Sequence, residues 1–562
     1  MLTRRDFLQV TMAASALGLP FLNNRGAFAA TEITEEDLLA FDPVGNVTLL
    51  NFTDIHAQLA PLFFREPSVN LGVGEASGLP PHLTGQEFLH HFGLTPGTAQ
   101  THAFTTVDYV DLAQNYGRIG GLAHMARAIN AIRAARPDQT LLIDNGDTWQ
   151  GSYAALKTQG ADMVQAMNAL GVDVMTAHWE FTYGENRVLE LIDMLNFPFL
   201  AGNVRDTEWD ETVFESTAYF DRGGVKIAVI GQAFPYTPVA NPRHLIPNWS
   251  FGIQENHIRT HVEGARASGA DLVVLASHNG FDVDRKLAGR VEGIDVILTG
   301  HTHDALPAVI PVGKTLLVAA GSHGKFLARL DLDVQNKQIK DYRFKLIPIF
   351  SDVLSPDPEM AKIVAALRAP YQAEMSRVLG KTESLLYRRG NFNGTFDDLI
   401  CQAILDDRDT EIALSPGFRW GASLLPGQDI TVEDVFTQTA ITYPQVYRSE
   451  MTGQLLKDIL EDVADNLFNP DPYYQQGGDM VRVGGLSYAI DISKPIGNRI
   501  SDMRLLSADK PIEAEKTYQV GGWASVNPEV AGPPVYDLVS QWIERQGSVR
   551  FQPHDRIKIS GA

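Results

Sequence analysis

Cysteine is nearly missing from this chain of 562 residues, in which Cys401 is the single example. One thiol cannot form an internal disulfide, and the apolar neighbours of Cys401 predict a small buried side chain. The lack of further thiols also argues against a structural zinc site with sulfur ligands. Internal repeats and low-complexity tracts are missing too. The length of the chain predicts more than one globular domain.

Positive charge is scarce beside negative charge, and the formal net charge is −22. That balance argues against a nucleic-acid partner, and an anionic substrate would need a local cationic patch. Beyond the amino terminus no apolar run approaches the length of a transmembrane helix, which predicts no membrane insertion.

The amino terminus carries an arginine pair within Thr3–Gln9, ahead of a mild apolar run over Val10–Leu22. Small residues at Ala27–Ala29 then offer a cleavage site. Together these features predict a twin-arginine export signal over residues 1–29 and a soluble mature protein in the periplasm. The alternative is an arginine pair on a frayed terminus.

Metal-ligating residue types follow five predicted strands, each where the strand ends. The apolar runs that predict these strands cover residues 47–51, 140–143, 172–176, 272–276 and 294–298. The carboxyl ends of parallel strands meet at one edge of a sheet, where open α/β sheets bind ligands. Two carboxylates and five imidazoles gathered there would hold two divalent ions, and this donor set suits manganese, zinc or iron. The candidate ligands are Asp54, His56, Asp147, His178, His278, His301 and His303.

The alternation of strands and helices predicts an α/β protein of two domains. Residues 30–350 would form a four-layer αββα sandwich, interrupted over 62–104 by an insertion rich in Gly, Pro and His. Residues 351–380 are expected to form a linking helix, and residues 381–562 a second, α+β domain. Four histidines of the insertion are interpreted as surface residues rather than ligands: His82, His90, His91 and His102.

Three further residues are candidates near the predicted centre. The glycines of 116–121 at a helix start would let backbone amides approach an anion, and Arg118 would add charge. A helix entry packed closely on the sheet is an equal alternative there. Asn145 would orient the nucleophile or a substrate oxygen, unless it is only a turn residue. Glu180 is interpreted as a partner that orients a ligand histidine.

The motifs resemble the 5′-nucleotidase family of two-domain metallophosphoesterases over nearly the whole chain after residue 29. The matching pieces are Asp54–His56, Gly146–Asp147, Gly202–Asn203, Ser277–Gly280, Gly300–His303 and Met451–Gly453. The resemblance implies a metallophosphoesterase-like first domain and a 5′-nucleotidase-like second domain. It implies that Asp147 bridges two ions, with Asp54, His56 and His303 at one and His178, His278 and His301 at the other. It also implies anion-binding arginines in the second domain, of which Arg419 matches best and Arg388 or Arg389 less well.

Two departures from the nucleotidase pattern narrow the resemblance. Where nucleotidases carry Gly-Asn-His-Glu-Phe-Asp, this chain has Ala177-His-Trp-Glu-Phe-Thr182. Trp179 therefore replaces the His that acts near the leaving group, and Thr182 replaces its Asp partner. The two Phe rings that clamp a base in nucleotidases align with Thr442 and Val526. We expect Trp179 and Thr182 to line an apolar throat that suits a peptide arm.

This combination is similar to the thiosulfohydrolase branch of the family, through Phe64–Ser68, Gly146–Gly151, Gly171–Met175 and His178–Gly184. The branch implies a di-manganese enzyme that releases sulfate from a sulfonated sulfane on a cysteine arm of the carrier SoxYZ. The chemistry of the leaving group is consistent with the replacement of the acidic His by Trp179. A thiol has a pKa of about 8.5, so its thiolate departs without a proton donor.

In that reading a water activated by the two ions attacks the terminal sulfonate sulfur. Arg419, with Arg118 or Arg389, would neutralise the sulfonate oxygens. A monomer is expected. The alternatives are an ordinary phosphomonoesterase or nucleotidase, a non-catalytic module that docks the carrier, and a decayed enzyme.

Overall fold

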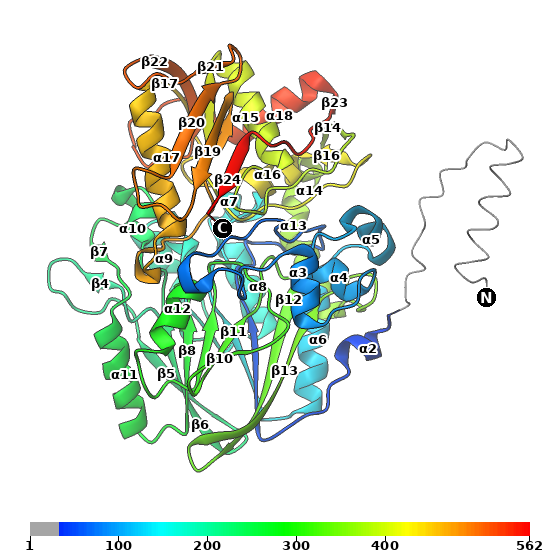
Figure 1. The fold of residues 1–562 in the computed structure, drawn as a ribbon. Coiled ribbons are helices and arrows are strands. Elements are labelled where there is room, and N and C mark those ends of the chain that lie inside the picture. The colour runs from blue at the N-terminus through cyan, green and yellow to red at the C-terminus, as the bar shows by residue number, and fades with distance from the viewer. Residues whose placement is uncertain (1–32, 562) are drawn as a thin grey trace, which may run out of the picture.

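The computed structural model describes residues 33–561 and shows two domains, one above the other in Figure 1. The export signal predicted over residues 1–29 lies outside the described residues. Among the helices that are described, none combines the length and apolar character needed to cross a membrane.

The first domain is built on two sheets whose inner faces pack on a common core. The first sheet has the order β13-β12-β1-β2-β3, in which β1, β2 and β3 are parallel. Its strands are β1 (Val47–Phe52), β2 (Thr140–Asp144), β3 (Val174–Met175), β12 (Phe326–Gln335) and β13 (Gln338–Pro348). The second sheet has the order β10-β11-β9-β8-β6-β5, with β6, β8, β9 and β11 parallel. Its strands are β5 (Thr217–Arg222), β6 (Val225–Gln232), β8 (Leu272–Ser277), β9 (Val296–Thr299), β10 (Ile310–Val312) and β11 (Thr315–Ala319).

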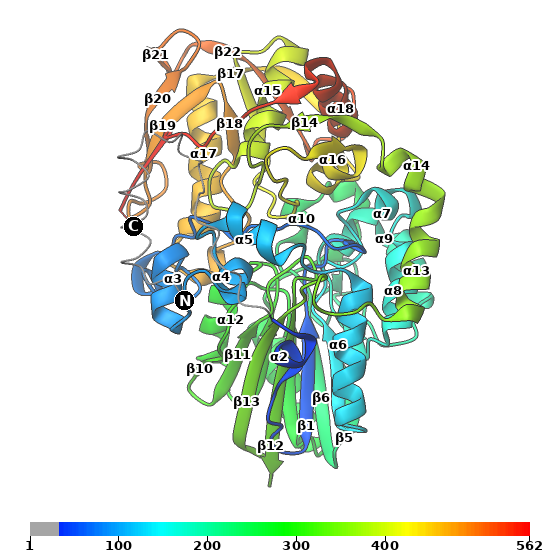
Figure 2. The ribbon, with the colours of Figure 1, turned by 90° about the vertical axis from the view of Figure 1, so that its right-hand side faces the viewer.

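Helices cover the outer face of each sheet, which confirms the four-layer αββα sandwich. In Figure 2 the helices α6, α8 and α13 lie together on one side of the domain. Helices α11 and α12 pack on the other sheet. Every residue of β1 and β8 is buried, as expected for parallel strands covered on both faces. The helices are α6 (Leu122–Ala135), α8 (Ala161–Leu170), α11 (Glu255–Ala267), α12 (Phe281–Ala288) and α13 (Pro358–Arg368).

The insertion over 62–104 is folded and contains the helices α3 (Gly85–Phe92) and α4 (Ala99–Phe104). His90 and His91 are exposed as expected. The interpretation of His102 as a surface residue is wrong, because its ring is buried against aromatic rings. His82 is largely buried too, and its Nε2 lies 2.7 Å from a carboxylate oxygen of Asp282 on α12.

The expected linking helix over 351–380 is broken into α13, a 3-10 turn at Ala369–Tyr371 and the short α14 (Gln372–Met375). Pro370 in the turn has no backbone N–H for a continuing helix, which explains the break. The first strand of the second domain, β14 (Val378–Thr382), begins three residues before the expected boundary and pairs with β16 (Asp429–Thr431) and β23 (Ser548–Val549).

The second domain adds two four-stranded sheets, ordered β17-β22-β15-β18 and β21-β20-β19-β24. Residues 482–491 form two strands that lie in different sheets. The break is at Gly485, where φ is +70° and a Cβ would lie 2.2 Å from the Glu411 carbonyl oxygen. The strands are β15 (Ile412–Ser415), β17 (Val446–Thr452), β18 (Arg482–Gly484), β19 (Leu486–Asp491), β20 (Ile500–Leu505), β21 (Lys510–Pro511), β22 (Thr517–Trp523) and β24 (Ile557–Ser560). The helices are α15 (Thr395–Arg408), α16 (Val432–Thr439), α17 (Gly453–Phe468) and α18 (Val535–Gln546).

Candidate metal centre and substrate cleft

The seven predicted ligands lie just beyond the ends of β1, β2, β3, β8 and β9, on turns with unusual backbone geometry. Five of them have positive φ: Asp54 (+53°), His56 (+48°), Asp147 (+55°), His301 (+75°) and His303 (+59°). Such values are uncommon outside glycine and persist where surrounding contacts hold them. Here the Asp54 N–H donates to the Gly146 carbonyl, and the His56 N–H to the Asp147 carbonyl, each at 2.8 Å.

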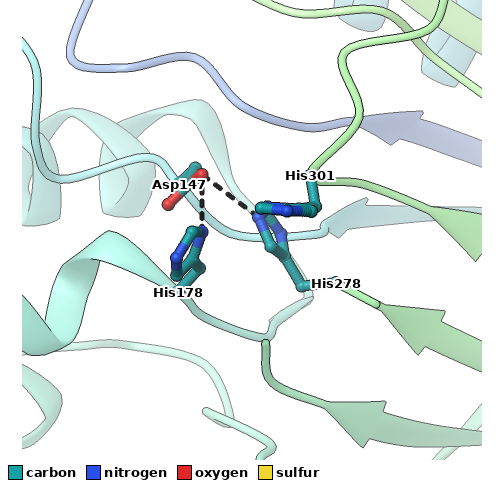
Figure 3. A group of neighbouring side chains, drawn as sticks. All are labelled: Asp147, His178, His278 and His301. Carbon is teal, nitrogen blue, oxygen red and sulfur yellow. Dashed lines mark hydrogen bonds and ion pairs between the residues drawn. The ribbon is translucent and has the colours of Figure 1, made fainter. Parts of the chain in front are cut away.

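All seven side chains come together in two groups that share Asp147. The donor atoms of each group lie within 4.8 Å of one another, and every member is buried. The first group is Asp147, His178, His278 and His301, shown in Figure 3, and the second is Asp54, His56, Asp147 and His303. The Asp147 Oδ2 lies 3.1 Å from His178 Nδ1 and 3.1 Å from His278 Nε2. The arrangement is that of a dinuclear site with one bridging carboxylate.

The ring nitrogens of the centre fit bound cations. The nitrogens that face the carboxylates are His56 Nε2 and His178 Nδ1, at 3.7 and 3.1 Å from Asp147 Oδ2, and His303 Nε2, at 3.1 Å from Asp54 Oδ1. The Nε2 atoms of His56 and His303 face each other at 3.1 Å. Carboxylate oxygens and imidazole nitrogens without thiolates suit divalent manganese, iron or zinc. The residues therefore fit two such ions.

The electrostatics of the centre also call for a cation. Burial raises the pKa of Asp54 to about 8, and the nearby Asp147 carboxylate adds to the rise. Burial alone would lower the pKa of His278, but the two carboxylates outweigh it and raise that pKa to about 10. Burial holds the pKa of His301 and His303 well below the usual value, so both are neutral and able to bind metal. Bound ions would supply positive charge to these carboxylates in place of a proton.

Glu180 orients the ligands through their backbone rather than through an imidazole. Its Oε2 accepts the N–H of His178 at 2.7 Å and that of Asp147 at 3.2 Å. Its Oε1 accepts the N–H of Thr148 at 2.6 Å. The predicted supporting role of Glu180 is thus visible, although the contact differs from the expected one.

The catalytic role expected for Asn145 is wrong for its side chain. Asn145 is fully buried, its Nδ2 donates to the carbonyls of Ser277 (3.2 Å) and Leu298, and its Oδ1 accepts from Asn51. The amide therefore ties the ends of the two sheets together. The backbone of Asn145 serves the centre instead, because its carbonyl lies 2.5 Å from His278 Nδ1 and turns His278 Nε2 towards Asp147.

A cleft of about 270 Å³ leads from the domain boundary to the centre. Five of the seven ligand residues line its base, and Trp179, Phe234, Tyr236, Phe418 and Trp420 line its walls. Trp179 lies edge-on to Phe418 and Trp420, with ring centres 5.4 and 5.1 Å apart. The apolar throat expected at Trp179 is present. Thr182 does not line it: Thr182 is buried and bonds Thr442 at 2.7 Å, so the substrate-binding role expected for it is wrong.

Only one of the candidate arginines lines this cleft. Arg419 does so, and its Nη1 donates to the His301 carbonyl at 3.3 Å. Arg389 stands behind it, buried, and donates to the Thr302 carbonyl at 3.0 Å. Arg388 is committed to Asp397 at 2.7 Å. Arg118 lines a separate cavity between the domains, 5.2 Å over the Phe63 ring, so its expected role at the anion is wrong.

Residues that were not predicted from the sequence join the second domain to the centre and to the 301–303 loop, here called the metal loop. The Gln476 carbonyl accepts from His301 Nε2 at 3.0 Å, which leaves His301 Nδ1 for a metal. A Cβ on Gly477 would lie 2.3 Å from the same Nε2. His323 packs on the His56 ring, with centres 5.5 Å apart, and accepts the Gly421 N–H at 3.2 Å. Of these, only His323 had a signal in the sequence, because it follows the apolar run that forms β11 (Thr315–Ala319).

The fold and the site together define a two-domain metallophosphoesterase of the 5′-nucleotidase type. The family "5′-nucleotidase, C-terminal domain" matches residues 378–524. Snake venom 5′-nucleotidase from Naja atra is 24% identical over 71% of this chain and 83% of its own length. A 5′-nucleotidase precursor from Thermus thermophilus superposes with a TM-score of 0.72 at 21% identity, over 92% of this chain and all of that one, which is a likeness of fold.

A solved structure of higher identity is more specific. Sulfate thiohydrolase SoxB from Thermus thermophilus is 35% identical, with a TM-score of 0.89 over 93% of this chain and 98% of that chain. The chain belongs to the SoxB family, the thiosulfohydrolase branch of the 5′-nucleotidase-type metallophosphoesterases.

Proposed function

We propose that this enzyme hydrolyses the sulfur–sulfur bond of a cysteine-bound S-sulfonate and releases sulfate. The substrate is carried on the cysteine arm of a carrier protein of the SoxYZ type, during thiosulfate oxidation. The observation that carries the proposal is the wall of the cleft beside the centre, where Trp179 stands in place of a proton donor. A leaving thiolate needs no such donor, whereas an alkoxide leaving from a phosphate ester benefits from one.

The reaction balances with water alone. The oxygen of water bonds to the terminal sulfur, the sulfur–sulfur bond breaks, and the departing thiolate keeps the electron pair. Water supplies one proton to that thiol and one to the sulfate, so no oxidant is consumed. Two divalent ions, which we propose to be Mn²⁺ from the family resemblance and the donor set, would lower the pKa of water and polarise the sulfonate.

The residues of the chain supply orientation and charge. Arg419, which lines the cleft, would hold the sulfonate oxygens. The apolar rings of Trp179 and Trp420 would exclude water from the leaving side and accept the narrow arm. The backbone N–H of Trp179 donates to Asp147 Oδ1 at 2.7 Å, so the throat and the bridging ligand are held by one residue.

A nucleotidase activity is the second candidate, and the 5′-nucleotidase relatives are its support. The walls of the cleft favour the sulfur substrate instead. The Phe418 and Trp420 rings stack on each other with centres 4.0 Å apart, so no base can insert between them. The two positions aligned with the clamping rings of nucleotidases hold Thr442, bonded to Thr182, and the half-exposed Val526.

The test compares two substrates on the manganese-loaded protein. We expect sulfate release from a thiosulfonate-charged carrier and no phosphate from AMP. His278→Ala should abolish sulfate release, because it removes one of the predicted metal ligands. His90→Ala, an exposed histidine outside the centre, should not. Unchanged sulfate release in the His278 variant would disprove the metal centre, and phosphate without sulfate would favour a nucleotidase. Carrier binding without any turnover would favour a docking module.

We also propose export to the periplasm by the twin-arginine pathway, on the pattern of Arg4 and Arg5 before an apolar run. Replacing both with Lys should leave the protein in the cytoplasm, as cell fractionation would show. Processed periplasmic protein from that variant would contradict the proposal.

A further inference from the structure

Four arginines of the second domain, three of them buried and the fourth, Arg419, lining the cleft, gather around two buried carboxylates. They are Arg388, Arg389, Arg419 and Arg482, with Asp397 and Asp479. Buried charges are costly unless they are paired, so the way in which the two carboxylates are shared decides where positive charge remains.

Asp479 is the carboxylate that contacts the arginines nearest the metal loop. Its Oδ1 lies 3.6 Å from Arg419 Nε and 3.9 Å from Arg389 Nη1. Its Oδ2 lies 2.8 Å from Arg482 Nη2. The side chain of Asp479 has no exposed area, yet the residue lines the cleft beside Arg419.

Arg389 and Arg419 keep donor groups free in spite of these contacts. Arg389 Nε and Nη1 and Arg419 Nε are buried without a hydrogen-bond partner among the described residues. Both guanidinium groups also donate to carbonyls of the 301–303 loop, which places them beside the predicted metal ligands. Asp479 therefore reduces, without cancelling, the positive charge that Arg389 and Arg419 present to a bound anion, since its carboxylate is also shared with Arg482.

The other acidic residues near the cluster do not contact Arg389 or Arg419 as directly as Asp479 does. Asp304 acts on Arg419 through its charge but forms no ion pair with either guanidinium among the described residues. Asp397 bonds Arg388 at 2.7 Å, lies 3.4 Å from Arg482, and forms no ion pair with Arg389 or Arg419 among the described residues.

We propose that Asp479 is a specificity-determining residue that offsets the Arg389–Arg419 pair, so that the cleft prefers a singly charged sulfonate to a doubly charged oxyanion. This rests on the proposed function. A bound S-sulfonate carries one negative charge, whereas a phosphate monoester carries nearly two at neutral pH, as sulfate does. The same balance would reject nucleotides and would let the sulfate product leave.

The test is anion binding to the manganese-loaded protein, measured by calorimetry with methanesulfonate as the monoanion and sulfate as the dianion. Asp479→Asn keeps the shape and removes the charge. We expect it to tighten sulfate relative to methanesulfonate by about tenfold, the order that one added charge produces near a partly buried ion. The matched control is Asp397→Asn, a buried carboxylate of the same cluster, which should leave the ratio unchanged.

An unchanged ratio in folded Asp479→Asn would overturn the proposal, and so would an equal change in the Asp397 variant. Should the Asp479 variant fail to fold, Arg389→Gln must shift the ratio the other way, against sulfate, and a ratio that stays constant there also overturns the proposal. The anion-binding measurement does not depend on turnover of a substrate. A shifted ratio without sulfate release from the carrier would therefore sink the proposed function while leaving the role of Asp479 intact.

Discussion

Glu180 shows at the scale of one residue how the centre is preorganised. Its carboxylate accepts backbone N–H groups from both Asp147 and His178, so it holds the turns on which two ligands stand. Groups behind the ligands commonly tune metal affinity by ten- to a hundredfold.

Glu180→Gln should therefore weaken manganese binding by about tenfold or more, because a neutral amide oxygen accepts these bonds less strongly. Titration of the metal-free protein with Mn²⁺ measures the change. Glu190→Gln is the control, since Glu190 is mostly exposed and pairs with Arg187. Equal affinities in the two variants would show that Glu180 does not support the ligands.

At the scale of elements, the irregular segment 475–480, which follows α17 and a 3-10 helix, joins the second domain to the 301–303 loop. Gly477 has φ of +74° and faces His301, whose Nε2 would lie 2.3 Å from an added Cβ. Any side chain here must push His301 or this segment away from the centre.

Gly477→Ala should lower both metal content and sulfate release, as metal analysis of the purified protein would show. Gly497→Ala is the matched control: its φ is +87°, so the backbone strain is similar, but an added Cβ there meets nothing within 4 Å. If both variants retain full metal content, the contact between Gly477 and His301 is not important for the centre.

The insertion over 62–104 is tied to α12 by the His82–Asp282 pair, and this tie should depend on pH. Burial lowers the pKa of His82, but the hydrogen bond and charge of Asp282 outweigh it, and the pKa is raised overall. A raised folded pKa stabilises the fold below the unfolded value of about 6.5, and the contribution is lost as pH rises through the folded pKa.

His82→Gln should thus lower the unfolding free energy most at acidic pH, by about 1 kcal/mol, and less at alkaline pH. Chemical denaturation of both proteins across pH 5 to 9 measures the difference. A difference that grows towards alkaline pH would contradict this assignment.

Figure 1 shows, at the scale of the molecule, the second domain above the ends of the first-domain sheets, where the ligands lie. The centre therefore lies where two sheets and two domains meet, and Asn145, Arg389 and Arg419 bond across these boundaries. Metal binding should stabilise the whole fold through these contacts.

Removing metal with a chelator should lower the melting temperature, and Mn²⁺ should restore it. The gain expected at a hundred times the dissociation constant is about 2.7 kcal/mol. His278→Ala should show a much smaller response to Mn²⁺. An equal response in that variant would place the stabilising ions elsewhere.

The ligand set was predictable from the sequence because residue type and strand ends are local properties. Buried apolar runs predict parallel strands, and a carboxylate or imidazole just past each run must fall at one edge of the sheet. The same reasoning found the αββα sandwich. It could not find the direction in which a side chain turns, and it therefore placed the Asn145 amide, Arg118 and Thr182 at the substrate.

Only the tertiary structure decided the pairings between distant segments. Gln476 is 175 residues from His301, and Arg419 is 118 residues from the carbonyl that it holds. No local pattern encodes such contacts, because they form only when packing brings the second domain onto the metal loop. The sequence by itself determined which groups could bind metal, and the packing of the domains determined their orientation and the charge that surrounds the anion.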